Sequence, residues 1–584
     1  MSALDTVDDL AAGRALGATG LLATLNAADV LDASDVHVAL RAGALTGEDD
    51  QELLLALAMV VRALRSGSTC LDLRTLSDEL AGHAVPADLA ARLAASPLAA
   101  DPAILHVEGD LVFLDRYWRE EGQVRDDLLS RIARPVDPVD PELLQAGLDR
   151  LFPASGWEEQ RAATAIAVNQ GTTVLTGGPG TGKTSTVAAV LALLCEHAAT
   201  TDQRPLRIAL TAPTGKAAAR LNEAVTDTMQ HWDETDRARL GDLRPMTLHR
   251  LLGSRPDSST RFRHNRENRL AQDIVVVDES SMLSLTMMAR LLESLRPETR
   301  LLLVGDPFQL ASIDAGAVLS DLVEGLAERP DIKLATLRTS HRFGPAIGGL
   351  AESIRLGDAV GALANLRSGD PKLEFIEDDD IESALHRRLL DRALDLRAAA
   401  AAGDVTGALE LLEQHRLLCA HREGPRGVNW WNRQVERWIS DETGDPLWDT
   451  WYPGRPILVT ANDYGLGIFN GDTGIAVMKD GELRVAIATT AGIRDFAPSR
   501  LSDVQTLHAM TIHKAQGSQA REITVLMPDE ESRLLTRELF YTAVTRAEEK
   551  VTIAGDEAVV RQALERQVRR ASGLRERISR SADV

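Results

Sequence analysis

The sequence comprises 584 residues, of which 44% are hydrophobic and 26% charged, a composition typical of a globular protein with several domains. No apolar run is long enough to cross a bilayer, and the acidic N-terminus lacks the features of a signal peptide, so we expect a cytoplasmic protein without a membrane contact. Three cysteines lie far apart (Cys70, Cys195, Cys419), which argues against a disulfide framework or a zinc site and predicts buried free thiols.

The first 138 residues are expected to form a mostly helical domain. The stretch QELLLALAMVVRAL (51–64) has apolar residues at helical spacing, Asp110–Trp118 is strand-like, and the proline-punctuated stretch Ala133–Glu142 predicts a linker. Residues 1–140 hold 24 acidic and 11 basic residues, a net charge of -13 out of -23 for the chain. So acidic a surface is unsuited to DNA, and it favours a protein partner or a solvated face.

From about Pro141 the pattern changes to short β-branched runs that alternate with helical segments. TTVLT, RIALT, DIVVVD and RLLLVGD come first, and REITVLM and KVTIAG follow beyond residue 330. This alternation predicts parallel sheets covered by helices, in two α/β domains over 139–330 and 331–584. The strand- and turn-rich segment near 454–500 predicts a small β-barrel (SH3-like) insertion in the second domain, and the polar residues 573–584 are expected to be frayed.

A phosphate-binding loop follows the first of these strands. The segment matches G-x-x-x-x-G-K-[ST] between a strand and a helix, and its expected nucleotide contacts are Gly177, Gly178, Pro179, Gly180, Thr181, Gly182, Lys183, Thr184 and Ser185. Small residues let backbone N–H groups close around a phosphate, and the following helix directs its positive end there. Lys183 would reach the β- and γ-phosphates of ATP, and the Thr184 hydroxyl would bind Mg²⁺.

An acidic pair, Asp278-Glu279, ends the strand DIVVVD about ninety residues later. Because neighbouring side chains at a strand end point in different directions, Asp278 is predicted to hold the Mg²⁺ and Glu279 to activate water. The phosphate loop and the acidic pair together predict a nucleoside triphosphatase.

Several further segments resemble, in order and spacing, the motifs of superfamily 1 helicases. They are GWEEQRAA with Gln160, TAPTGKAAARL, TLHRLLG, GDPFQLASIDAG with Gln309, LRTSHRF with Arg342, TLHAMTIHKAQGSQ, and LLTRELFYTAVTRAEEKV with Arg546. The resemblance implies two RecA-like domains and an ATP site in which Gln160 reads the adenine and Gln309 lies near the γ-phosphate. Arg342 and Arg546 would supply positive charge from the second domain, so that the site is complete only when the two domains close.

The same resemblance places single-stranded DNA on short polar or basic side chains near strand ends, which suit phosphate contacts. These expected DNA contacts are Thr214, Lys216, Thr247, His249, His513, Lys514, Gln516 and Ser518. The segment Ser254–Leu270 has five arginines against one aspartate and one glutamate, and we expect either a DNA-contacting hairpin or a solvated basic loop. We expect the pair Trp430-Trp431 to lie in the core.

Within the superfamily, REGPRGVNWWN (Arg422–Asn432) and LVFLDRYWREE (Leu111–Glu121) resemble signatures of the RecD family. That resemblance implies 5′→3′ movement on DNA, partnership with RecB-like and RecC-like subunits at DNA ends, and a role in double-strand-break repair by recombination. No nuclease-like carboxylate cluster is seen, and the nuclease is expected in a partner subunit. A helicase that works alone, and a structural subunit switched by nucleotide, are the alternatives. Intact Glu279, Arg342 and Arg546 argue against the latter, and the acidic N-terminal region mildly against the former.

Overall fold

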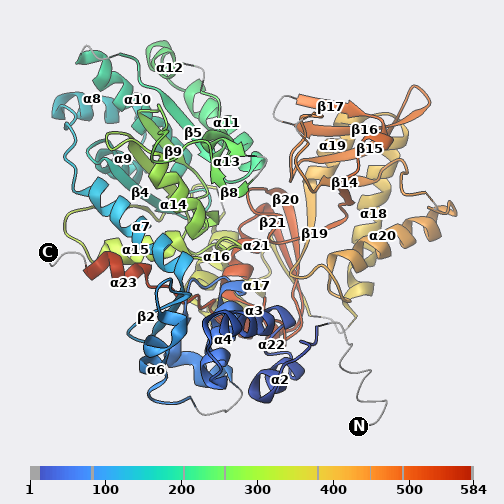
Figure 1. Ribbon diagram of the computed structural model, residues 1–584. Helices are drawn as coiled ribbons and strands as arrows, with labels where there is room; N and C mark the ends of the chain where they lie inside the picture. Colours follow the sequence, from blue (N-terminus) through green and yellow to red (C-terminus); the bar gives the residue numbers. More distant parts are fainter. Residues whose placement is uncertain are drawn as a thin grey trace, which may run out of the picture.

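The computed structural model describes residues 13–580 except 81–84, 202–203, 242, 256–257, 343, 378–379, 448, 464 and 490–491. The chain forms an N-terminal domain, two α/β domains that face each other, and an insertion at the outer end of the second (Figure 1). We call residues 139–337 the first motor domain and residues 338–584 the second, because residues 335–337, beyond the predicted boundary at 330, complete the sheet of the first domain. Among the described residues, no helix has the length and apolar character needed to cross a bilayer.

The N-terminal domain is helical, as predicted, with one small sheet. Asp50 caps helix α4 by accepting hydrogen bonds from the N–H groups of Glu52 and Leu53, and α4 buries every residue from Leu53 to Val60. The antiparallel strands pair in the order β1-β3-β2. The elements are α2 (Gly20–Ala27), α3 (Ala33–Thr46), α4 (Gln51–Arg65), β1 (Leu71–Asp72), α5 (Leu76–Glu79), α6 (Leu89–Ala95), β2 (Leu105–Glu108) and β3 (Leu111–Leu114).

Helix α7 (Asp115–Ile132) follows β3 directly, so the strand expected over Asp110–Trp118 ends at Leu114. This helix packs against α14 (Leu285–Ser294) of the first motor domain, and Val124 and Leu128 lie in the core of that domain. The guanidinium of Arg131 donates to the carbonyl oxygen of Arg296 at 3.0 Å. The last helix before the predicted boundary at residue 138 therefore packs as part of the first motor domain.

The first motor domain is built on a six-stranded sheet in the order β11-β4-β10-β9-β5-β6, in which neighbouring strands run parallel. Its strands are β4 (Thr172–Gly177), β5 (Ile208–Ala212), β6 (Met246–Thr247), β9 (Ile274–Val277), β10 (Arg300–Gly305) and β11 (Ala335–Leu337). Its helices are α8 (Pro141–Leu151), α9 (Glu158–Val168), α10 (Lys183–Thr200), α11 (Gly215–Gln230), α12 (Glu234–Leu240), α13 (Leu248–Leu252), α14 and α15 (Val318–Ala327). Because strands β4 and β9 run the same way, the phosphate loop and the acidic pair emerge at one edge.

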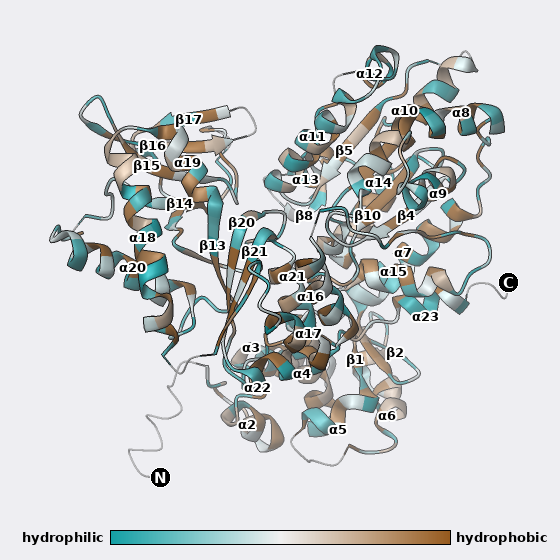
Figure 2. Cartoon of the chain, turned by 180° about the vertical axis from the view of Figure 1, so that it is seen from behind, coloured by the Kyte–Doolittle hydropathy of each residue, from teal (hydrophilic) through white to brown (hydrophobic). Residues whose placement is uncertain are grey.

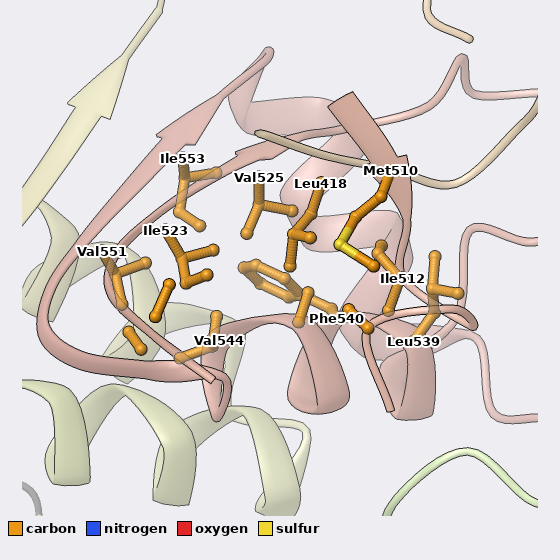
Figure 3. Close-up of a cluster of buried hydrophobic side chains, with 14 of the residues drawn as sticks. Leu418, Met510, Ile512, Ile523, Val525, Leu539, Phe540, Val544, Val551 and Ile553 are labelled. Carbon is orange, nitrogen blue, oxygen red and sulfur yellow. The ribbon is translucent and has the colours of Figure 1, made fainter. Parts of the chain in front are cut away.

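The second motor domain repeats the design with parallel strands in the order β12-β21-β20-β13-β19. Phe540 lies among Leu418, Ile523 and Val525 in its core (Figure 3). Helices α16 and α17 beside this sheet are rich in hydrophobic residues (Figure 2). The elements are β12 (Leu373–Ile376), β13 (His415–Cys419), β19 (Ala509–Thr511), β20 (Ala520–Leu526), β21 (Ala547–Ala554), α16 (Pro345–Leu356), α17 (Ala359–Leu366), α18 (Ile381–Ala401), α19 (Val405–Gln414), α20 (Val428–Thr443), α21 (Arg537–Val544) and α22 (Glu557–Glu565). Two tandem parallel-sheet domains are thus confirmed.

The insertion is a five-stranded antiparallel sheet with its own apolar core. Its strands, in the order β17-β16-β15-β14-β18, are β14 (Pro456–Val459), β15 (Thr473–Lys479), β16 (Glu482–Thr489), β17 (Gly492–Phe496) and β18 (Val504–Thr506). No pairing between β17 and β18 closes it within the described residues. The β-rich insertion is confirmed, whereas the SH3-like barrel is not.

The fraying expected over residues 573–584 is wrong for residues 574–579, which form a helix, while residues 581–584 lie outside the described part of the chain. After α22 the chain returns to the N-terminal domain, where Thr69 N donates to the carbonyl oxygen of Ala571 at 2.9 Å. It ends in helix α23 (Leu574–Ser579), which packs against α15 and α7. Leu574 and Ile578 are fully buried in the core of the first motor domain, so this segment joins the two motor domains a second time.

Candidate functional site at the cleft between the motor domains

The phosphate loop lies between β4 and α10, as the motif predicts. Gly180 and Gly182 have φ angles of 77° and 83°, a region that favours glycine. A Cβ on Gly180 would lie 2.3 Å from Cβ of Arg342, so the loop tolerates no side chain there. The ammonium group of Lys183 donates to the carbonyl oxygens of Gly177 and Gly178, at 2.7 and 2.9 Å. The lysine is therefore held inside the loop, where it can exchange these carbonyls for phosphate oxygens.

The acidic pair lies beside this loop, at the end of β9. Asp278 is half-buried at the wall of the nucleotide cavity, and its Oδ1 accepts a hydrogen bond from the N–H of Glu279 at 2.9 Å. Burial, together with the neighbouring Glu279 carboxylate, raises the pKa of Asp278, while Lys183 acts in the opposite direction. Glu279 has φ 51°, a strained conformation that is uncommon for a residue with a side chain. A partly buried carboxylate such as that of Asp278 is suited to a divalent cation.

Both motor domains line a cavity of about 540 Å³ around these groups. The lining includes Lys183, Thr184, Ser185, Asp278, Glu279, Gln309, Arg342 and Arg546. The structure thus brings together the predicted catalytic residues from both domains. The volume of this cavity is within the range of small-molecule binding sites in proteins.

Gln160 is fully buried against the phosphate loop, next to the cavity-lining Trp157 and His341 but not itself part of the lining. Its Nε2 donates to the carbonyl oxygen of Thr181 at 2.8 Å, while its Oε1 has no hydrogen-bond partner among the described residues. The indole of Trp157 stacks on His341, with ring centroids 5.0 Å apart and planes 19° from parallel. A buried amide oxygen without a donor, next to two stacked rings, is suited to a flat base that offers an N–H group.

A chain of hydrogen bonds crosses the cleft between the domains. The buried guanidinium of Arg546 donates to Oε1 of Gln309 at 3.0 Å, and Nε2 of Gln309 donates to Asp306 at 3.2 Å. The hydroxyl of Tyr541, from the second domain, donates to the same Asp306 oxygen at 3.0 Å. Burial raises the pKa of Asp306, and Lys183 opposes this shift. Arg546 is therefore attached to the wall of the nucleotide cavity rather than to a surface partner.

The expected DNA contacts divide into several groups. Thr214 and Thr247 cap helices α11 and α13 by accepting hydrogen bonds from backbone N–H groups. Gln516 and Ser518 are buried, and Nε2 of Gln516 donates to the carbonyl oxygen of Leu310 across the cleft at 2.8 Å. The Ser518 hydroxyl instead donates within its own turn, to the carbonyl oxygen of Ala515 at 2.8 Å, and contact of either side chain with DNA stays a prediction.

The remaining candidates are basic groups closer to the surface. His249 is exposed, and Lys514 donates to Oε1 of Gln505 at 2.9 Å. Burial lowers the pKa of His513. Lys216 is half-buried under a loop of the insertion, whose Gly471 would carry a Cβ 3.9 Å from Cβ of Lys216. Burial and the nearby Arg416 and Arg220 lower the pKa of Lys216 to about 7.

The basic segment forms a short hairpin of β7 (Ser254–Arg255) and β8 (Ser258–Phe262). Beyond it, Arg266 pairs with Asp127 at 2.8 Å, and Arg269 donates to the carbonyl oxygen of Leu295 at 2.9 Å. At least two of the five arginines therefore hold the segment in place.

The predicted core residues agree with the structure. Trp431 is buried among the hydrophobic residues of the second motor domain, and Trp430 packs against them. Cys70 and Cys419 are buried free thiols, and Cys195 is half-buried.

Sequence reasoning missed four residues that line the cavity, Trp157, Arg220, His341 and Glu548, and the hydrogen-bonded pair Asp306 and Tyr541. All six lie inside segments that the motifs had already marked. Arg220 lies one helical turn after Lys216, on the same face of α11. This i, i+4 spacing within the marked segment TAPTGKAAARL was the signal that could have pointed to Arg220.

Comparison with known proteins assigns the three parts of the chain separately. A RecD N-terminal domain of the RecBCD enzyme matches residues 27–107, an AAA domain matches residues 160–315, and a UvrD-like helicase C-terminal domain matches residues 506–554. A Bacteroides Pif1 helicase solved with ADP-AlF3 and single-stranded DNA is 15% identical, with a TM-score of 0.39, and covers 73% of this chain and 96% of its own.

Two curated relatives match along nearly the full length. The RecBCD enzyme subunit RecD of Mycobacterium tuberculosis H37Rv is 56% identical over 572 residues, which is 97% of this chain and 98% of the relative. The same subunit of Mycolicibacterium smegmatis is 57% identical over 557 residues, 94% of this chain and 98% of the relative. The chain belongs to the RecD family of RecBCD enzyme subunits.

Proposed function

We propose that this chain is an ATP-driven 5′→3′ single-stranded DNA translocase and helicase. It would serve as a motor subunit of a RecBCD-type helicase-nuclease in double-strand-break repair by recombination. The observation that supports this best is the hydrogen-bond chain from Arg546 through Gln309 to Asp306 and Tyr541. Through it, both motor domains hold the same nucleotide cavity, as a motor requires in order to turn hydrolysis into a movement of one domain against the other.

In the proposed reaction, Lys183 exchanges its two loop carbonyls for the β- and γ-phosphates of ATP. Thr184 and Asp278 hold Mg²⁺, which neutralises negative charge on the phosphates when it is bound. Glu279 accepts a proton from the attacking water. The raised pKa of Asp278 supports this assignment, since a partly buried carboxylate is stabilised by a nearby cation.

Arg342 and Arg546 stabilise the charge that develops on the transferred phosphoryl group. Both come from the second motor domain and line the cavity, with Arg342 directly beside Gly180 of the phosphate loop. Gln309 positions Arg546 through the hydrogen bond at 3.0 Å. Hydrolysis would therefore be fast only when the cleft is closed, and opening of the cleft would follow release of phosphate.

The direction of movement is tested by displacement of streptavidin from biotinylated oligonucleotides. A translocase that moves 5′→3′ travels toward the 3′ end, so we expect ATP-dependent displacement from a 3′-biotinylated strand. Displacement from a 5′-biotinylated strand should stay at the spontaneous rate. The Lys183→Gln variant is the control, because it retains the DNA-binding surface. Faster displacement from the 5′ end would contradict the proposed polarity.

We further propose that the acidic N-terminal domain docks on RecC-like and RecB-like subunits. The structure indicates at which residue a truncated chain should begin in order to test this docking. A chain beginning at Asp140 lacks Val124 and Leu128 and uncovers the apolar residues against which they pack, at a cost of about 3–6 kcal/mol. A chain beginning at Asp115 retains α7.

We expect the 115–584 chain to keep ATPase activity stimulated by single-stranded DNA and to lose co-purification with co-expressed RecB-like and RecC-like subunits. The 140–584 chain should melt at a lower temperature, which calorimetry would measure. Normal assembly of the 115–584 chain with both partners would contradict docking through the N-terminal domain and favour a helicase that works alone. Absence of ATP turnover in the full-length chain with DNA would instead favour a structural subunit switched by nucleotide.

A further inference from the structure

Helix α11 carries two basic side chains, Lys216 and Arg220, that are one turn apart on the same face. This face lies in the cleft between the motor domains. Arg220 lines the nucleotide cavity, whereas Lys216 lies under the insertion loop, on the side expected to bind DNA. One rigid helix therefore extends from the nucleotide toward the DNA path.

Arg220 is a cation whose charge is poorly compensated. It is half-buried, and among the described residues it has no hydrogen bond and no ion pair within 4.0 Å. Burial and the nearby Arg546 and Arg342 lower its pKa to about 10, while Glu548 and Glu279 act in the opposite direction. A guanidinium that is partly removed from water beside two others is costly unless an anion joins it.

The residues around Arg220 in the cavity indicate which anion would bind to its guanidinium. Arg220 is close enough to Glu279, Arg342 and Arg546 for their charges to shift its pKa, and these are the groups proposed to act at the terminal phosphate. A planar guanidinium can donate two hydrogen bonds to a phosphate group. Unlike Arg342 and Arg546, Arg220 belongs to the same domain as the phosphate loop, so it can bind before the cleft closes.

We infer that Arg220 binds the γ-phosphate of ATP and that helix α11 thereby links nucleotide binding to DNA binding at Lys216. This inference rests on the proposed function. A second link passes through Arg416, a buried residue of β13 in the second motor domain, because its charge acts on both Lys216 and Arg220. A phosphate bound at Arg220 therefore changes the electrostatic field and the packing around Lys216, one turn away on α11.

The test uses the full-length chain and two equilibrium titrations. The first measures affinity for AMP-PNP and for ADP, and the second measures affinity for fluorescein-labelled oligo-dT with and without AMP-PNP. In Arg220→Ala we expect AMP-PNP to bind about tenfold or more weakly, since charged hydrogen bonds are lost, and ADP to bind within about twofold of the wild type. The effect of AMP-PNP on oligo-dT affinity should largely disappear. Arg220→Lys should restore part of both effects.

Asn222→Ala is the matched control, because Asn222 is exposed on the same helix and outside the cavity. It should behave as the wild type in both titrations. An equal loss of AMP-PNP and ADP affinity in Arg220→Ala, with the nucleotide effect on oligo-dT intact, would show a structural role and overturn the inference. So would unchanged AMP-PNP affinity. Failure of the proposed function would show separately, as a wild-type chain that binds nucleotide but does not hydrolyse it with DNA.

Discussion

Replacement of Lys183 by glutamine is expected to lower DNA-stimulated ATPase activity by a factor of about 10²–10³ or more, the scale seen when one group that stabilises the transition state is lost. Among the described residues, the hydrogen bonds of the ammonium group go to carbonyl oxygens of its own loop, so the substitution removes a charge without disturbing the core. The measurement is steady-state phosphate release with saturating oligo-dT.

Two controls accompany this variant. Its thermal melting should match that of the wild type, because Gly177 and Gly178 remain able to bind water in place of the lysine. Its affinity for oligo-dT without nucleotide should also be unchanged, since Lys183 lies in the nucleotide cavity. ATP turnover near that of the wild type in a well-folded variant would exclude the assigned site as the place of hydrolysis.

The phosphate loop and the acidic pair could be predicted from sequence because their chemistry is concentrated in a few consecutive residues. In the loop, glycines at Gly180 and Gly182 are required by positive φ angles, and Lys183 follows at fixed spacing. In the same way, the β-branched run before Asp278 indicates a buried strand. Local pattern and local function coincide there, so no long-range information is needed.

Other parts of the site depend on contacts between distant residues. Asp306 and Tyr541 are 235 residues apart. An aspartate after a strand and a tyrosine in an amphipathic helix are both common, so no local sequence pattern predicts the hydrogen bond between them. The burial of Gln516 could not be predicted from the sequence either, since its hydrogen-bond partner is a backbone carbonyl of the first motor domain. Short polar residues in a DNA-binding motif can contact either DNA or other protein segments. The sequence does not distinguish these two roles, whereas the contacts across the cleft do.

The ends of the domains were mispredicted for a related reason. The run from Leu111 to Trp118 looks like one strand because its apolar and aromatic residues favour strands locally. The strand ends at Leu114, and α7 begins because Val124 and Leu128 can be buried on one helical face against the first motor domain. The spacing of Leu574 and Ile578 was a signal for the C-terminal helix, but a single i, i+4 pair is weak evidence without its partner helices.

The two carboxylates of the site should respond differently to loss of charge. Glu279→Gln keeps Thr184 and Asp278 for the metal, so we expect Mg²⁺·ATP to bind with near wild-type affinity and turnover to fall by a factor of about 10²–10⁴, the usual contribution of a general base. The unhydrolysed complex should hold the cleft closed and dissociate slowly from oligo-dT. Asp278→Asn removes a metal ligand, and the Mg²⁺ dependence of nucleotide binding should weaken by tenfold or more.

A pH titration of nucleotide binding separates the two roles further. Because burial raises the pKa of Asp278, its carboxylate takes up a proton as the pH falls through a mildly acidic range. Only the ionised form binds Mg²⁺, so wild-type affinity for Mg²⁺·AMP-PNP should fall in that range. Glu279→Gln should retain this fall, shifted to lower pH because a neighbouring negative charge is gone, whereas Asp278→Asn should lack it. Equal affinities and equal pH profiles in the two variants would contradict the assignment of Asp278 to the metal and of Glu279 to the water.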